Sequence, residues 1–144
     1  LMIAFIALLI MLVDQGTKYI VQQYMELGQT IAVIPNVFHF TYILNPGAAF
    51  GLFPYQNWIF LIIVVALFIA FFMFRNKIEL APFYFKLGIS FLLGGSLGNA
   101  IDRIRIQSVI DFFDWRIWPI FNIADIAICV GTFLIMLYFW REEL

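Results

Sequence analysis

Residues 57–74 read NWIFLIIVVALFIAFFMF, eighteen consecutive positions without a charged side chain. Coiled as an α-helix, this stretch is about 27 Å long, close to the hydrocarbon thickness of a bilayer, about 30 Å. A run of this length and composition is typical of a transmembrane helix. It indicates that the chain crosses a membrane and that the rest of the fold is organised around helices of this kind.

Three further segments have a similar apolar character. Residues 1–13 and residues 87–101 carry no charged side chain, and residues 120–140 contain one charged residue, Asp125. Together with the stretch above, the sequence predicts one domain, residues 1–144, with transmembrane helices at about 2–25, 57–74, 83–103 and 120–140.

Composition agrees with a membrane protein. Of 144 residues, 65% are hydrophobic and 12% are charged, whereas soluble domains carry about 25% charged residues. A formal net charge of -1 offers no basic surface for nucleic acid. The single cysteine, Cys129, excludes an internal disulfide and a cysteine-based metal cluster. We therefore expect an integral membrane protein with no metal, no other cofactor and no nucleic-acid partner.

The distribution of lysine and arginine predicts the orientation. The connection 26–56 contains neither residue, whereas the loop 75–82 contains Arg75 and Lys77. Because cytoplasmic loops carry the excess of positive charge, both termini and the 75–82 loop are expected in the cytoplasm. Residues 26–56 and 104–119 are then extracytoplasmic.

The first outer connection has the alternation of β-strands. Thr30–Ile34 and Val37–Leu44 flank a Pro35-Asn36 turn. Ile104–Phe113 is also β-prone and is a candidate further strand. The sequence predicts a membrane all-α bundle of four transmembrane helices with a small antiparallel β-sheet on its outer surface.

Polar residues within apolar helices are costly and mark functional positions. Asp14 and Lys18 are four residues apart and lie on one helix face. Two interpretations have about equal weight by this argument. The two residues either form an ion pair that orients the helix, or contact a substrate directly.

The third apolar segment ends in a polar stripe. Gly94 and Gly98 form a small-xxx-small pair, which is typical of close helix packing. Gly95, Asn99 and Asp102 share one face, and an amide and a carboxylate facing lipid would lack partners. This face is therefore expected to line a site.

Two further acids flank the entrance to the fourth span. Asp111 precedes this span, and Asp125 is expected about five residues, roughly 8 Å, inside a helix beginning near Pro119, beyond the reach of the helix dipole. Two carboxyl groups at short range cannot both ionise, so one keeps its proton and the other is a base. Such a pair can activate water for attack on a peptide bond, although paired acids also serve ion transport.

Five blocks in order resemble the lipoprotein signal peptidase family, also called signal peptidase II, the aspartyl peptidases of the bacterial inner membrane. They are DQGTK (14–18), NPGAAF (45–50), GGSLGNAIDR (94–103), VIDF (109–112) and FNIAD (121–125). Each block alone is a weak signal, but five in the same order cover nearly the whole chain.

The resemblance implies a specific site and substrate. Asp111 and Asp125 match the catalytic aspartates. The other matched positions, implied to bind substrate or to support the aspartates, are Asp14, Lys18, Asn45, Gly47, Gly98, Asn99, Asp102, Arg103 and Asn122. The implied substrate is a prolipoprotein whose cysteine bears diacylglycerol, cut just before that cysteine, and globomycin-like cyclic peptides are the implied inhibitors. In the implied fold the outer sheet is called the β-cradle, and a short peripheral helix around 48–55 lies beside it. The chain is expected to act as a monomer.

Two competing functions are a proton-coupled transporter using Asp14 or Asp102, and a non-catalytic lipid-binding or assembly protein. A transporter is expected to hold its acid near the bilayer midplane. Here Asp111 and Asp125 both fall toward the outer face, the depth at which a diacylglyceryl cysteine is held. A lipid-binding protein has no need of both acids.

Overall fold

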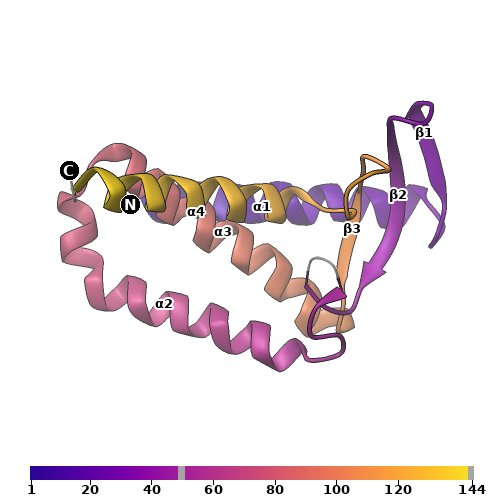
Figure 1. Ribbon diagram of the computed structural model, residues 1–144. Coiled ribbons are helices and arrows are strands. Elements are labelled where there is room, and N and C mark those ends of the chain that lie inside the picture. The colour runs from indigo at the N-terminus through magenta and orange to yellow at the C-terminus, as the bar shows by residue number, and fades with distance from the viewer. Residues whose placement is uncertain (49–50, 143–144) are drawn as a thin grey trace.

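The computed structural model describes residues 1–48 and 51–142. The elements, in chain order, are α1 (Met2–Tyr24), β1 (Thr30–Ile34), β2 (Phe38–Asn45), α2 (Asn57–Leu80), α3 (Phe83–Ile106), β3 (Val109–Asp114) and α4 (Ile123–Glu142). The helices form an elongated body, the sheet stands at one end, and both chain ends and the α2–α3 connection lie at the other (Figure 1). We call these the sheet end and the terminal end.

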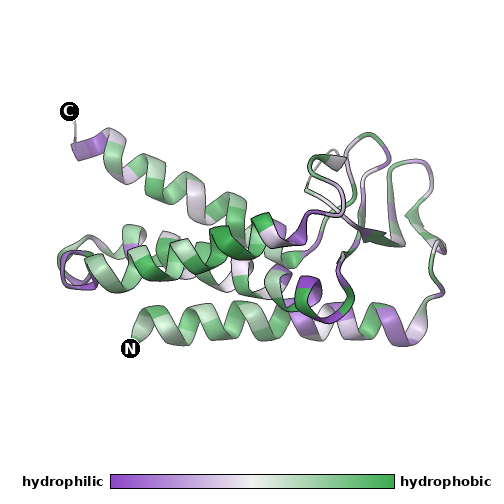
Figure 2. Ribbon diagram, turned by 90° about the horizontal axis from the view of Figure 1, so that it is seen from below, coloured by the Kyte–Doolittle hydropathy of each residue, from purple (hydrophilic) through white to green (hydrophobic). Residues whose placement is uncertain are grey.

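Three helices of the described chain, α1, α2 and α4, are long and apolar enough to cross a membrane. Figure 2 shows hydrophobic residues along most of their length. The fourth helix, α3, is equally long but carries the small and polar residues of the stripe. It packs against each of the other three helices and buries eleven residues, whereas α2 buries one, Ile78. A helix enclosed by others faces protein, so its side chains need not be apolar.

Glycines on α3 allow this central packing. A Cβ built at Gly94 would lie 2.6 Å from the Ala7 carbonyl oxygen of α1. One at Gly95 would lie 2.6 Å from the Ala124 oxygen of α4. Neither site has room for a larger residue, so the predicted close packing is confirmed for Gly94.

The sheet has the order β1-β2-β3 and both pairs are antiparallel. The two strands predicted from alternation are confirmed almost to the residue. The third was predicted too early: Ile104–Ile106 is the last turn of α3. Gln107, with a φ of 57° in the left-handed region, ends the helix, and β3 begins two residues later. Asp111 pairs with Ile43 in this sheet.

Two helices have bounds that differ from the predicted spans. Beyond the apolar run, α2 continues to Leu80, because the residues that follow are compatible with a helix. In contrast, α4 begins at Ile123 and not near residue 120, because Phe121 pairs with Phe113 as an extension of the sheet.

The predicted peripheral helix around 48–55 includes residues 49–50, which lie outside the described residues. In the described part of this segment, backbone bonds close turns. The Ala48 N–H donates to the Leu52 oxygen at 2.8 Å, and the Tyr55 N–H donates to the Pro46 oxygen at 2.9 Å.

Candidate active site

A cavity of about 490 Å³ lies at the sheet end, between the sheet and helices α3 and α4. Its lining includes Asn45, Gly47, Asn99, Arg103, Asp111 and Asp125. Six of the eleven site residues predicted from the sequence therefore meet at one cavity, contributed by the β2 end and its following turn, α3, β3 and α4.

Asp111 lies in the middle of β3, and its side chain is almost completely buried, at 1% exposed. Its carboxyl group accepts hydrogen bonds from Asn45 Nδ2 at 3.2 Å and from Asn122 Nδ2 at 2.8 Å. Burial, with the nearby charge of Asp125, raises the pKa of Asp111 to about 8, although the two amide donors act in the opposite direction. Asp111 therefore holds a proton at neutral pH.

Asp125 lies in the first turn of α4. The expectation that it sits too deep for the helix dipole is wrong, because the helix starts later than predicted. Its Oδ2 accepts the Asn122 N–H at 3.1 Å, while Asn122 Oδ1 accepts the Asp125 N–H at 2.9 Å. This reciprocal pair is a capping box. Asn99 Nδ2 donates to the other oxygen, Oδ1, at 2.9 Å, so two donors and the helix N-terminus all stabilise negative charge on Asp125.

Asn122 joins the two acids. Its side chain is completely buried and its amide contacts Asp111 through nitrogen and the Asp125 backbone through oxygen. Because the residue also caps α4, the start of the helix and the strand carrying Asp111 are tied by one side chain. Asn122 thus contacts both carboxyl groups, that of Asp111 through its side-chain nitrogen and that of Asp125 through its backbone N–H.

Lys18 is the centre of a buried polar cluster beneath the cavity. Its ammonium lies 2.8 Å from both Asp14 Oδ2 and Asp102 Oδ2, and donates to Asn99 Oδ1 at 3.0 Å. The predicted Asp14–Lys18 ion pair is thus present. Asp14 is fully buried and does not line the cavity, so the structure favours the ion pair over direct contact with a substrate.

The two acids that flank Lys18 also bind backbone. Asp14 Oδ1 accepts the Ala124 N–H at 2.9 Å, and Asp102 Oδ2 accepts the Ile110 N–H at 3.0 Å. Ala124 and Ile110 are the residues immediately before Asp125 and Asp111. Lys18 and its two partners therefore connect the backbone of both candidate catalytic residues.

Gln15 and Gly98 complete this cluster. Gln15, missed as a site residue although it lies in the DQGTK block, donates from Nε2 to Asp102 Oδ1 and to the Gly98 oxygen, both at 2.9 Å. Position 98 has no room for a larger residue, because a Cβ there would meet the Asp14 carboxylate. The glycine that the pattern assigned to packing therefore makes room for a charged group.

Arg103 lies at the edge of the cavity. Its guanidinium donates to the Gly47 oxygen at 3.2 Å and lies 4.2 Å from the ring centre of Phe60, on α2. Its Nε is buried without a hydrogen-bond partner among the described residues. Phe60 has no signal in the sequence, because only the fold brings α2 to this arginine.

Cys129 is exposed and lines the cavity. The helix turns this position toward the same opening as Asp125, four residues earlier. Within residues 1–48 and 51–142, no group of three histidine, cysteine, aspartate or glutamate side chains is placed to hold a metal ion.

Long apolar helices carry a cavity at which two carboxyl groups meet, and Asn122 contacts both of them. A pair of carboxyl groups of which one is protonated defines a protein of the aspartic peptidase class. Comparison with known proteins agrees with this class. The family described as "Signal peptidase (SPase) II" matches residues 6–141. The chain belongs to this family of aspartic peptidases.

Individual relatives are similar over nearly the whole length. A lipoprotein signal peptidase of Halothermothrix orenii is 39% identical, over 99% of this chain and 97% of its own. One of Pelotomaculum thermopropionicum is 44% identical, over 88% and 83%. A solved bacterial membrane enzyme is 35% identical, with a TM-score of 0.90 over 99% of this chain and 89% of its own. Because the chain belongs to a peptidase family, the transporter and the lipid-binding protein are rejected as alternatives.

Proposed function

We propose that this protein removes the signal peptide from diacylglyceryl-modified prolipoproteins, cutting just before the lipidated cysteine with a water molecule activated by Asp111 and Asp125. The observation that carries this proposal is a pair of carboxyl groups on one cavity, that of the buried Asp111 and that of the half-buried Asp125, both in contact with Asn122. The relatives named above are lipoprotein signal peptidases, which supports this class of substrate.

In the proposed mechanism the two acids have unequal roles. Asp125, stabilised as a carboxylate by its donors, takes a proton from water as the oxygen attacks the scissile carbonyl carbon. Asp111 gives its proton to the carbonyl oxygen, producing a neutral tetrahedral diol. Collapse of the diol breaks the C–N bond; one diol hydroxyl returns its proton to Asp111, and Asp125 protonates the departing cysteine nitrogen. The products are a signal peptide with a new carboxyl group and a lipoprotein with a free amine.

Arg103 is proposed to bind a main-chain carbonyl of the substrate. Its Nε is buried and lacks a partner within the described chain, and the guanidinium is held in place by Phe60 and the Gly47 oxygen. A donor fixed in this way aligns an extended peptide beside Asp111. The apolar remainder of the cavity wall, including Ile126 and Val130, suits the lipobox side chains.

The proposed membrane arrangement has four spans, with the sheet outside and both termini inside. Enclosure of α3 by apolar helices supports a fourth span. The carboxyl groups lie at the sheet end, where α4 begins, and this position supports a site at the outer membrane surface. A cysteine carrying diacylglycerol is held at this depth, since its acyl chains remain in the bilayer.

The test is cleavage of a purified precursor in lipid–detergent micelles, followed by gel shift and by mass measurement of the new N-terminus. The diacylated precursor is expected to be cut before its cysteine, while the same precursor without lipid is left intact. A chelator is expected to have no effect. Equal cleavage of both precursors would contradict the proposed substrate, and loss of activity with the chelator would indicate a metal enzyme.

A further inference from the structure

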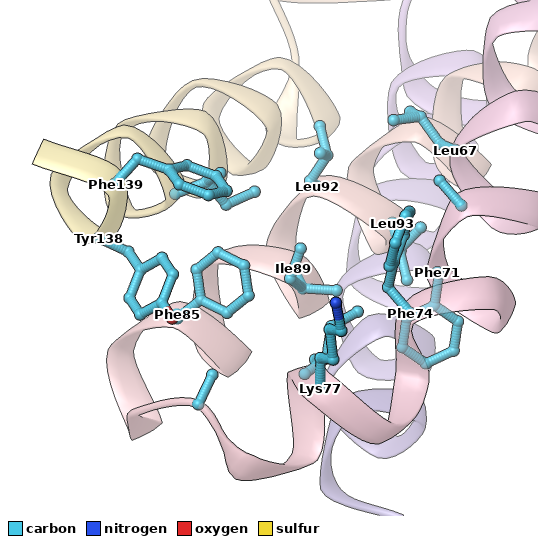
Figure 3. A pocket seen from close by; sticks show the side chains of 14 residues that line it. Leu67, Phe71, Phe74, Lys77, Phe85, Ile89, Leu92, Leu93, Tyr138 and Phe139 are labelled. Atoms are coloured by element: carbon cyan, nitrogen blue, oxygen red, sulfur yellow. The ribbon is translucent and has the colours of Figure 1, made fainter. Parts of the chain in front are cut away.

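A second cavity, of about 480 Å³, lies toward the terminal end between α2, α3 and α4 (Figure 3). It shares no lining residue with the active-site cavity. Ile135 in its wall is ten residues after Asp125 on α4, about 15 Å further along the helix. The two cavities are therefore separate and lie at different positions along the helices.

The cavity exists because two helices pack tightly and a third does not. A Cβ at Gly131 of α4 would lie 2.6 Å from the Gly88 oxygen of α3, so these backbones are in close contact. Over the same region α2 buries only Ile78. The wall consists almost entirely of hydrocarbon side chains, such as Phe71, Ile89 and Leu93. Such a space offers water no partners but suits an acyl chain.

One cation is part of this apolar wall. Lys77, in the last turn of α2, directs its ammonium inward toward Ile89 in Figure 3. Two neighbouring cations have other contacts: Lys86 donates to the Glu79 oxygen at 3.3 Å, and Arg141 lies 5.8 Å from the Tyr84 ring centre. In the part of the chain that the structure describes, Lys77 has no hydrogen bond or ion pair.

We propose that this cavity binds an anionic phospholipid, with one acyl chain among the hydrophobic side chains and the headgroup phosphate on Lys77. Charge distinguishes this occupant from the apolar segment of a signal peptide, since signal peptides carry a positive n-region that Lys77 would repel. A basic group at the mouth of an apolar space between membrane helices is a suitable site for an acidic headgroup. The inference does not depend on the proposed cleavage chemistry.

The test uses full-length protein stripped of lipid and mixed with phosphatidylglycerol or phosphatidylcholine of identical acyl chains. Retained lipid is measured by native mass spectrometry. Wild-type protein is expected to retain phosphatidylglycerol about fivefold better. Lys77→Gln should abolish this preference, and Arg75→Gln, which removes a cation outside the cavity wall, should leave it intact. No preference in the wild type, or equal losses in the two variants, would overturn the proposal.

A second pair of variants tests the acyl-chain part. Ala70 lines the cavity and Ile69 does not. Ala70→Trp fills the space and should reduce retention of both lipids, whereas Ile69→Trp should not; both variants are checked for unchanged helix content. Wild-type retention by Ala70→Trp would overturn the site. Displacement of bound phosphatidylglycerol by a synthetic signal peptide would also overturn it, by identifying the peptide as the occupant.

Discussion

Asp14, on the first helix, accepts a hydrogen bond from the backbone N–H of Ala124, at the start of the fourth, over a distance of 2.9 Å. The bond joins residues 110 positions apart in the sequence. Because Ala124 directly precedes Asp125, the first helix fixes the backbone of a proposed catalytic residue that lies on another helix. The ion pair with Lys18 in turn fixes the Asp14 carboxylate.

Replacing Asp14 tests this support. Asp14→Leu removes the acceptor and leaves Lys18 with one charged partner fewer, and breaking a buried ion pair costs about 3–5 kcal/mol of stability. Asp14→Asn keeps an acceptor for Ala124, so it is expected to retain more kcat than Asp14→Leu, with KM changed little in both. Denaturation in detergent and steady-state cleavage measure the two effects. A large rise in KM alone would show that Asp14 contacts substrate.

Replacing Asn122 tests the link between the two acids. Asn122→Ala removes a donor to Asp111 and the cap of α4. Loss of a preorganised donor of this kind typically costs about 10²–10³ in kcat, while loss of an N-cap costs about 1 kcal/mol of stability. Cleavage rate and unfolding midpoint are measured together. Near-normal kcat in a folded Asn122→Ala protein would remove the amide from the mechanism.

The raised pKa of Asp111, about 8, predicts an alkaline limit to activity. The proton that this residue donates is lost above that pH, so kcat should fall there. Asn45→Ala removes a hydrogen bond that lowers the pKa of Asp111, and the limit should therefore move to higher pH. A limit that moves to lower pH in Asn45→Ala would contradict this assignment.

The same shift affects stability. The pKa of Asp111 is higher in the folded state than its ordinary value of 3.8. Its contribution to the free energy of unfolding is therefore fully present below that value and is lost as the pH rises through about 8. Wild-type protein should lose stability between pH 6 and pH 9 relative to Asp111→Asn, which has no such proton. Parallel stability profiles would show that Asp111 does not titrate in this window.

Gly98 and Gly16 form a matched pair of glycine substitutions. Gly98→Ala places a methyl group on the Asp14 carboxylate and should reduce both activity and stability. Gly16 lies inside α1, and a Cβ added there would have no atom within 4 Å, so Gly16→Ala should stabilise the helix by about 0.5–1 kcal/mol without loss of activity. Equal activity and stability of the two variants would show that the space between Gly98 and the Asp14 carboxylate can accommodate a methyl group.

Much of the fold could be predicted from local patterns. The charge-free run predicted α2, and alternation predicted β1 and β2, because these features depend on neighbours in the sequence. The start of α4 could not be predicted, since it depends on a bridge between Phe121 and Phe113 that exists only in the folded sheet. The end of α3 was missed for a local reason, because a left-handed Gln107 has no clear sequence signal.

The site was predictable to a different degree. A spacing of four predicted the contact of Lys18 with Asp14, but no spacing connects Lys18 to Asp102, 84 positions away in the sequence. The contact between Phe60 and Arg103 could not be predicted from the sequence either. Family resemblance supplied the membership of the site, while the structure supplied how its members are joined.

The proposed pair of catalytic acids is tested most directly by cleavage of a diacylated prolipoprotein by Asp111→Asn, Asp125→Asn and Asp114→Asn. Asp114 is an acid on the same strand as Asp111, but it lies outside the cavity and binds Thr41 and Arg116. We predict that Asp111→Asn and Asp125→Asn fold and bind precursor without cutting it, whereas Asp114→Asn cuts. Full cleavage by either of the first two variants would contradict the assignment of the pair.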